Sequence, residues 1–127
     1  MNQIRPGRDE ADYVARRMRA FRLAVDGRCD DALAQLTEGW TDKLPKPGDY
    51  ISDVARVRYL AGEYEEALGA LDIVRGEIVD EMTPLAIDCV RRDPRLWRAA
   101  LPVVARRGSP VDRGRAAWAV VRARLDA

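Results

Sequence analysis

The centre of the chain contains the segment Leu60-Ala61-Gly62-Glu63-Tyr64-Glu65-Glu66-Ala67-Leu68. Apolar residues on both sides of the glycine recur at spacings of three and four, which are typical of helices. Glycine adopts the left-handed conformation that ends many helices, and acids stabilise the positive end of the helix that follows. The segment therefore predicts two antiparallel helices that meet in a tight turn at Gly62.

The rest of the chain shows the same helical spacing, and no part of it has a convincing strand pattern. Helices are expected at about residues 9–26, 28–38, 50–61, 63–81, 84–92, 94–107 and 110–125. Pro102 is expected to kink the sixth of them. The predicted N-caps are Asp9, Asp49, Thr83, Asp93 and Ser109. With 127 residues and 14.3 kDa, the chain is predicted to be one all-α domain, residues 1–127, of six or seven helices.

Each predicted helix carries an apolar stripe that is expected to face the core. In the first helix the stripe is Val14, Met18, Phe21 and Val25, and in the last it is Val111, Gly114, Trp118, Val121 and Leu125. Gly69 and Gly76 are predicted to let a neighbouring helix approach the fourth helix closely. Cys29 and Cys89 lie among apolar residues and are expected to be small buried hydrophobes.

The chain also contains an internal repeat, because a shift of 35 residues places Gly27 on Gly62. The pairs that then coincide are Ala20 and Ala55, Cys29 and Tyr64, Ala32 and Ala67, Leu33 and Leu68, and Leu36 and Leu71. Small residues thus recur where two antiparallel helices would cross. The repeat predicts two similar helical hairpins.

The second copy resembles the centre of a tetratricopeptide repeat in its turn glycine, aromatic residue, acid pair and Ala-Leu. The resemblance is clear over about residues 50–78, fair over 15–39 and degenerate after 84. It implies a right-handed array of antiparallel hairpins at about 9–39 and 49–81, followed by a degenerate hairpin or cap at about 84–126. Leu23 and Arg58 depart from the pattern, because they stand where the family usually has an aromatic residue.

The resemblance further implies a groove, lined by the first helix of each pair, that binds an extended polypeptide segment. The residues that would face it are Arg17 and Phe21 in the first copy and Ser52, Arg56 and Tyr59 in the second. The arginines are expected to hold a carboxylate, while the aromatic rings contact apolar side chains. The simpler alternative is that Phe21 belongs to the core and the arginines are solvated.

The composition excludes several kinds of chemistry. The chain has no histidine, which excludes imidazole-based nucleophiles and most catalytic zinc sites. The two cysteines match no metal-ligand spacing, and the scattered glycines form no phosphate loop. Adjacent acids such as Glu65 and Glu66 point in different directions on a helix, so they do not face each other across a reacting bond. We therefore expect no metal, no cofactor and no enzymatic activity.

The chain contains no run of 18 apolar residues, and its first residues lack the apolar stretch of a secretory signal. We expect a cytoplasmic protein with reduced thiols and no membrane span.

The net charge of +1 conceals three blocks of charge. Residues 1–25 carry +3, residues 26–90 carry −9 and residues 91–127 carry +7. A basic end of one copy could meet the acidic middle of another, so a homodimer is expected with Arg91, Arg95 and Arg98 at or near the contact. At least one of Trp40, Trp97 and Trp118 is also expected at an interface. The alternative is a monomer whose basic C-terminal helices pack on its own acidic middle.

The function predicted from the sequence is that of a small cytoplasmic adaptor of bacterial type, which binds a protein or peptide partner. The alternative is a nucleic-acid-associated regulatory protein that uses its basic C-terminal helices. Trp97 and Trp118 are expected on apolar stripes rather than among the arginines, which disfavours a platform for stacking bases.

Overall fold

The computed structural model describes residues 6–38, 47–73, 82–105 and 110–126. These ranges contain seven α-helices, one 3-10 helix and no strand, which confirms the all-α prediction. The elements are α1 (Pro6–Val25), α2 (Cys29–Glu38), α3 (Pro47–Leu60), α4 (Tyr64–Ile73), α5 (Thr83–Arg92), η2 (Pro94–Leu96), α6 (Trp97–Val104) and α7 (Pro110–Leu125).

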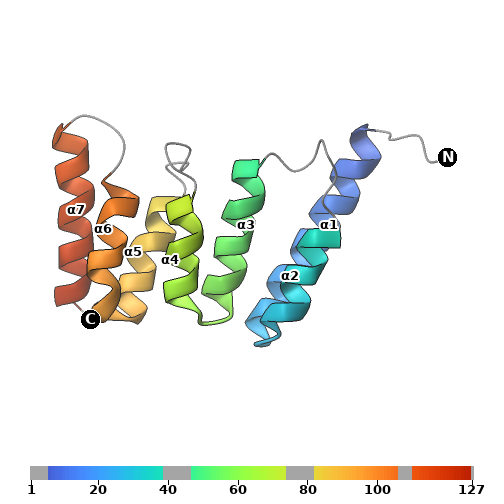
Figure 1. Ribbon diagram of the computed structural model, residues 1–127, viewed down its shortest axis with the longest axis horizontal. Helices are drawn as coiled ribbons and strands as arrows, with labels where there is room; N and C mark the ends of the chain where they lie inside the picture. Colours follow the sequence, from blue (N-terminus) through green and yellow to red (C-terminus); the bar gives the residue numbers. More distant parts are fainter. Residues whose placement is uncertain (1–5, 39–46, 74–81, 106–109, 127) are drawn as a thin grey trace.

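The helices form an elongated array in chain order, with α1 at one end and α7 at the other (Figure 1). Successive helices run in alternating directions, and α1 packs along α2 as α3 packs along α4. Buried apolar side chains form one cluster among α1, α2 and α3 and a larger cluster from α3 to α7. Because α3 contributes Val57 to the first cluster and Ala55 to the second, it joins the two ends of the core.

The internal repeat is visible in the packing. Three pairs of residues related by the shift of 35 are all fully buried: Ala20 and Ala55, Ala32 and Ala67, and Leu36 and Leu71. The alanines leave room for the two helices of each pair to approach closely. Equivalent residues therefore have equivalent packing roles in the first two helix pairs.

The turns after α1 and α3 have the same hydrogen-bonded geometry. Gly27 and Gly62 adopt φ values of +82° and +83°. The amide after each glycine donates to the carbonyl five residues earlier, from Arg28 to Leu23 at 2.9 Å and from Glu63 to Arg58 at 2.8 Å. Each glycine amide donates to the carbonyl three residues earlier. Both turns are therefore Schellman motifs.

An ion pair and a thiol reinforce the second turn. A Schellman motif often has an apolar contact between the residues at its two ends, but here Arg58 and Glu63 form an ion pair of 2.7 Å. The same Arg58 nitrogen lies 3.7 Å from the sulfur of Cys29, the first residue of α2. Arg58 thereby links the turn of the second helix pair to the first pair.

Three of the predicted N-caps are wrong. Asp9 lies inside α1 and Asp49 inside α3, because both helices begin at a preceding proline. Proline suits the first turn of a helix, since its φ is fixed and its missing N–H needs no partner. Thr83 is the first residue of α5, and Met82 precedes it as the N-cap without a side-chain bond. Asp93 does cap η2, because its carboxylate accepts a hydrogen bond from the Arg95 amide.

Two predicted helices differ in extent from the observed ones. The helix expected at 94–107 is divided into η2 and α6, and Pro102 lies within α6. The helix expected at 63–81 is observed as α4 up to Ile73, and its remainder, including Gly76, lies outside the described residues. Trp40 and Ser109 also lie outside them.

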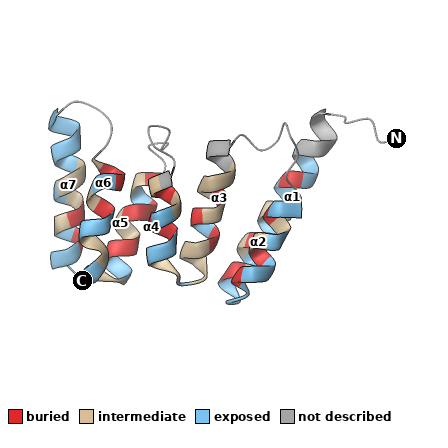
Figure 2. Ribbon diagram, viewed as in Figure 1, coloured by how far each residue is buried: buried red, intermediate tan, exposed pale blue. Residues whose placement is uncertain are grey.

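The predicted inner stripes of the two terminal helices are wrong. The exposed fractions of Val14, Met18 and Val25 are 44%, 56% and 65%, and α1 instead buries Tyr13, Ala20 and Ala24. On α7 the side chains of Val120 and Ala123 are buried, whereas Val111, Trp118 and Leu125 are exposed. The outer faces of both helices are largely exposed (Figure 2). A helix at the end of an array has neighbours on one side only, and the small residues face that side.

Gly69 does not mediate a close helix contact, contrary to the prediction. A Cβ atom placed on Gly69 would have no atom within 4 Å beyond its immediate surroundings, and the residue is exposed. The two central turns, in contrast, require glycine because of their positive φ.

We predict that Gly62→Ala lowers the free energy of unfolding by about 1–2 kcal/mol, because alanine is strained in the left-handed conformation. Gly69→Ala is the matched control, and it should raise the free energy of unfolding by about 0.5–1 kcal/mol, because alanine is the better helix former. Urea unfolding followed by circular dichroism measures both changes. Equal stability of the two variants would contradict the role of the Gly62 turn.

We also predict that Glu63 makes the protein sensitive to acid. The hydrogen bond from the Cys29 thiol, and then that from Arg58, lower the pKa of Glu63. The resulting stabilisation is present above the unfolded pKa of about 4.3 and is lost as the pH falls through the lower folded pKa. Between about pH 5 and about pH 3, Glu63→Gln should therefore lose less free energy of unfolding than the wild type. The exposed Glu66→Gln serves as the control, and an acid response equal to that of Glu63→Gln would overturn the assignment.

Candidate functional site

Side chains of α1, α3 and the start of α5 meet on one surface, which we call the α1–α3–α5 surface. It is formed by Tyr13, Arg17 and Phe21 on α1, by Asp53 and Arg56 on α3, and by Met82 next to α5. The three α1 residues follow one another at spacings of four, so they lie along one ridge of the helix. Three of the five groove residues expected from the sequence stand within this set.

A buried hydrogen bond joins the first residue of the ridge to α3. The Tyr13 hydroxyl donates to Oδ2 of Asp53, and both residues are less than a tenth exposed. Burial raises the pKa of Tyr13 well above its usual range, and the bond to Asp53 adds to this effect. Tyr13 therefore stays protonated and remains a donor, which fixes α1 against α3.

Arg56 spans all three elements of the surface. Its guanidinium carbon lies 5.9 Å from the centre of the Phe21 ring, and its Nη2 lies 3.9 Å from the sulfur of Met82. Phe21 and Arg56 are equivalent positions of the two repeats, so the contact joins one repeat to the next. Phe21 is only partly buried and Arg56 is exposed, so the cation remains accessible above the ring.

Arg17 lies on the ridge between Tyr13 and Phe21. Its Nε is shielded from solvent and has no hydrogen-bond acceptor among the described residues. Its positive charge lowers the pKa of Tyr13, against the larger effects of burial and Asp53, which shows that it lies near that pair. Arg17 thus carries a donor that the described part of the chain does not satisfy.

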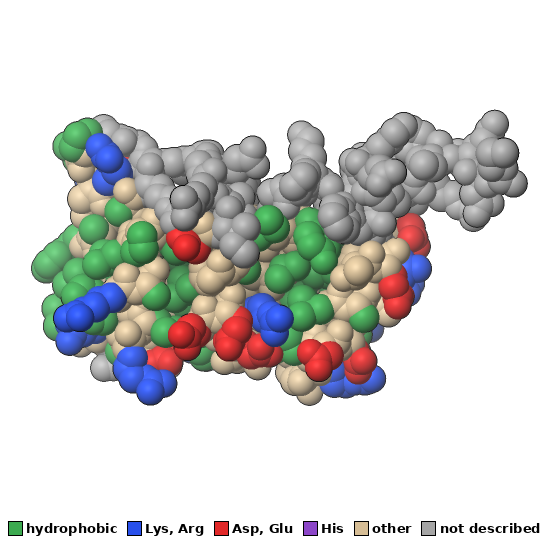
Figure 3. Space-filling model, viewed as in Figure 1, with side chains coloured by type: hydrophobic (Ala, Val, Ile, Leu, Met, Phe, Trp, Pro, Cys, Tyr) green, Lys and Arg blue, Asp and Glu red, His purple; other side chains and the backbone are tan. Residues whose placement is uncertain are grey.

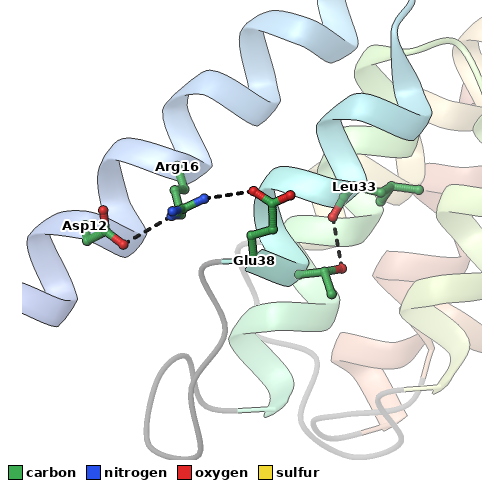
Figure 4. Close-up of polar contacts among 5 residues, drawn as sticks. Asp12, Arg16, Leu33 and Glu38 are labelled. Carbon is green, nitrogen blue, oxygen red and sulfur yellow. Dashed lines mark hydrogen bonds and ion pairs between the residues drawn. The ribbon is translucent and has the colours of Figure 1, made fainter. Parts of the chain in front are cut away.

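The neighbouring Arg16 has a different role. It pairs with Asp12 of α1 and with Glu38 of α2, each at 3.1 Å (Figure 4). Thr37, on the same part of α2, donates to the Leu33 carbonyl and lies 3.2 Å from the Tyr50 hydroxyl of α3. These contacts hold the end of α2 against the middle of α1 and the start of α3, so Arg16 serves the fold.

Ser52 and Tyr59 are placed differently from the other predicted groove residues. The Tyr59 ring packs against Tyr64 of α4, with ring centres 5.6 Å apart, and it lies against the larger core cluster. Ser52 is partly buried on α3, four residues before Arg56. The structure brings together Arg17, Phe21 and Arg56, and it directs Tyr59 towards its own helix pair.

The three arginines predicted at a dimer contact make different contacts within the chain. Arg91 is exposed at the end of α5, and Arg95 pairs with Asp93 at 3.0 Å. The guanidinium of Arg98 lies 5.2 Å from the centre of the Trp97 ring. The charge of Glu65 on α4 also acts on Arg95. The basic C-terminal part therefore meets part of the acidic middle within one chain.

Trp97 packs against the larger core cluster, as its predicted place on an apolar stripe implies, but its ring also lies among charges, contrary to the prediction. Arg98 and Arg124 both lie over its ring, the latter at 4.7 Å from the centre. Trp118, in contrast, does not face the core, since 60% of it is exposed. Figure 3 shows arginines on the part of this face formed by α6 and α7, and carboxylates along the lower edge of the middle of the array.

The cysteines and acidic residues of the described part of the chain provide neither a thiolate nor a metal-binding cluster. Both cysteines are buried and free, and burial raises the pKa of Cys29 to about 11 and that of Cys89 to about 12. Neither thiol forms a nucleophilic thiolate near neutral pH. The described residues also contain no cluster of three or more His, Cys, Asp or Glu that could hold a metal ion. None of the helices described has the length and apolar character needed to cross a membrane.

Tyr13, Asp53 and Met82 belong to the surface but were not predicted from the sequence. Asp53 stands at helical spacing from Tyr50 and Val57, which both lie on the apolar side of α3. An acid on an apolar stripe needs a buried hydrogen-bond partner, so the position of Asp53 in the sequence could have predicted a buried hydrogen bond. Nothing in the sequence identifies Tyr13 as that partner, because the two residues are 40 positions apart.

No protein-family model matches the chain, and searches of curated proteins and of solved structures give no significant match. The surface is therefore interpreted from its own geometry.

We predict that Tyr13→Phe lowers the free energy of unfolding by about 1–3 kcal/mol, because it removes a donor from the buried Asp53. The matched control is Tyr64→Phe, which keeps the ring contact with Tyr59 and should change stability by less than about 0.5 kcal/mol. Chemical denaturation curves fitted with a common m-value compare the free energies of unfolding of the two variants. Similar free energies of unfolding for both variants would show that the hydrogen bond from Tyr13 to Asp53 contributes little to stability.

Proposed function

We propose that this protein is a non-catalytic interaction module that binds an extended polypeptide segment across the α1–α3–α5 surface. The observation that carries the proposal is the position of Arg56, which is exposed, contacts Phe21 and Met82, and forms no ion pair with a carboxylate of the described residues. An arginine on a platform of apolar groups can receive a carboxylate while its neighbours contact an apolar side chain.

The chemistry of the surface specifies the kind of segment. The exposed guanidinium of Arg56 offers donors that suit the side chain of an aspartate or glutamate, and Arg17 adds positive charge on the ridge that carries Phe21. Phe21 and the exposed Met18 and Val14 of α1 offer apolar area beside them. The expected ligand is a segment with an acidic residue next to a large apolar residue.

The platform is held in place before any ligand arrives. The Tyr13–Asp53 bond fixes α1 to α3, and the ion pairs of Arg16 fix α1 to α2. A rigid surface loses little conformational entropy on binding, which favours affinity. The resemblance of residues 50–78 to a tetratricopeptide repeat supports the same proposal, since relatives of that family use the first helix of each pair for peptides.

A nucleic-acid-associated role for the basic C-terminal helices is the alternative, but the contacts of Trp97 favour it less. Arg98 and Arg124 already lie over the ring on which a base would stack. Arg95 is paired with Asp93, so its charge is partly neutralised within the chain. We place the protein in the cytoplasm as an adaptor of bacterial type, and a homodimer through Arg91, Arg95 and Arg98 remains a prediction.

The test is a selection from a library of random peptides displayed on phage, with the full chain as bait. We expect the selected peptides to combine an acidic residue with a large apolar one. Arg56→Ala should then weaken the binding of a selected peptide at least about tenfold, since a hydrogen bond to a charged group contributes about 1.5–3 kcal/mol. Arg17→Ala should weaken it in the same direction, as measured by fluorescence anisotropy.

Arg19→Ala is the control, because Arg19 is exposed and points away from the Tyr13–Arg17–Phe21 ridge. Its affinity for the peptide should stay within about twofold of the wild type. Selected peptides without acidic residues, or full affinity in both Arg56→Ala and Arg17→Ala, would exclude this surface as the binding site. Selective binding of single-stranded RNA that falls steeply with salt would favour the alternative.

A further inference from the structure

The outer side of α7 carries a row of large apolar side chains that no described residue covers. Val111, Trp118 and Leu125 are 63%, 60% and 69% exposed, and we call these three residues the α7 outer stripe. They are seven residues apart, so they fall on one line along the helix. Gly114 and the partly buried Val121 stand at the intermediate positions, so this side of α7 has the residue spacing of a coiled-coil face.

The stripe lies opposite the face by which α7 joins the fold. That inner face consists of Ala116, Val120 and Ala123, which pack into the core cluster shared with α5 and α6. Because α7 forms the end of the array, the outer stripe occupies the place where one more helix would stack (Figure 1). Large exposed apolar side chains that gather on one face within a polar rim are characteristic of protein interaction sites.

The rim of the stripe is basic on both sides. Arg115 and Arg122 are exposed, and helical geometry places both along the same edge of the stripe. On the other side of the helix, Arg124 lies over Trp97, next to Arg98. The ion pair between Arg122 and Asp126 is long, at 3.6 Å, and both side chains are largely exposed. A ligand with apolar residues in the centre and acids at its flanks would complement this arrangement.

We propose that the α7 outer stripe docks an acidic amphipathic helix of a partner protein, at a site separate from the α1–α3–α5 surface. The partner helix would lay its apolar positions on Val111, Trp118 and Leu125 and its acids beside Arg115 and Arg122. The docked helix continues the row of helices by one position.

A second copy of the chain fits the stripe less well. Residues 110–126 carry four arginines and two aspartates, so two α7 helices would bring like charges together. Docking the exposed apolar side of α1 of a second copy on the stripe would also bring like charges together, because residues 11–25 carry four arginines and one aspartate. Like charges across an interface oppose association, so neither terminal helix of a second copy complements the basic rim of the stripe, whereas an acidic partner helix does.

The proposal is tested with synthetic helical peptides and the full chain. The probe has leucines at heptad a and d positions and glutamates on both flanks, and its matched control has lysines in place of the glutamates. We expect the glutamate peptide to bind at least about tenfold more tightly, with an affinity that falls as salt is added. A scrambled peptide of the same composition should not bind, and titration calorimetry measures all three.

Variants of exposed residues then locate the site. Trp118→Ala should weaken the binding of the glutamate peptide at least about tenfold. The double variant Arg115→Glu, Arg122→Glu should bind the lysine peptide more tightly than the glutamate peptide. Their circular dichroism should match the wild type, since the replaced side chains are exposed. Arg56→Ala, on the other surface, should leave this binding unchanged, so the two proposals fail independently.

Three results would overturn the proposal. One is equal affinity for the glutamate and lysine peptides, and another is full binding by Trp118→Ala. The third is a doubled mass in light scattering that Trp118→Ala restores to that of the monomer, because a second copy would then cover the stripe.

Discussion

The left-handed backbone at Gly27 and Gly62 is the constraint on which the packing of the first four helices depends. Each turn closes with the same two backbone hydrogen bonds, so the second helix of each pair leaves at the same angle. This angle brings Ala20 against the helix of Ala32, and Ala55 against that of Ala67. Because alanine fills so little space, the helices approach closely and the bulkier side chains are left for other faces.

The close approach of small residues explains why the ends of the array are apolar on the outside. The large apolar side chains that are exposed among the described residues all belong to α1 and α7. Inner helices have neighbours on both sides, whereas α1 and α7 each bury one face, which consists of alanines together with Tyr13 on α1 and Val120 on α7. On α1 the remaining stripe borders Phe21 and Arg56, and on α7 it stands alone between basic edges.

The sequence was sufficient for the features that depend on local chemistry. Helical spacing gave the all-α class, and the shift of 35 residues identified both turn glycines and the buried Ala and Leu pairs. It was insufficient where a helix has two apolar stripes, because periodicity does not say which one faces the neighbour. It also could not pair Tyr13 with Asp53 or place Arg124 over Trp97, since these contacts depend on how distant helices are stacked.

Charge blocks in the sequence proved a poor guide to which arginines are available to partners. Arg16, Arg58 and Arg95 pair with carboxylates of the chain itself, and they serve helix ends and turns. Arg56 carries the same charge but contacts the Phe21 ring and the Met82 sulfur instead, and it forms no ion pair with a carboxylate of the described residues. The α1–α3–α5 surface and the α7 outer stripe involve different helices, so occupancy of one does not obstruct the other. Two separate surfaces on one array would allow the adaptor that we propose to hold two polypeptides at once.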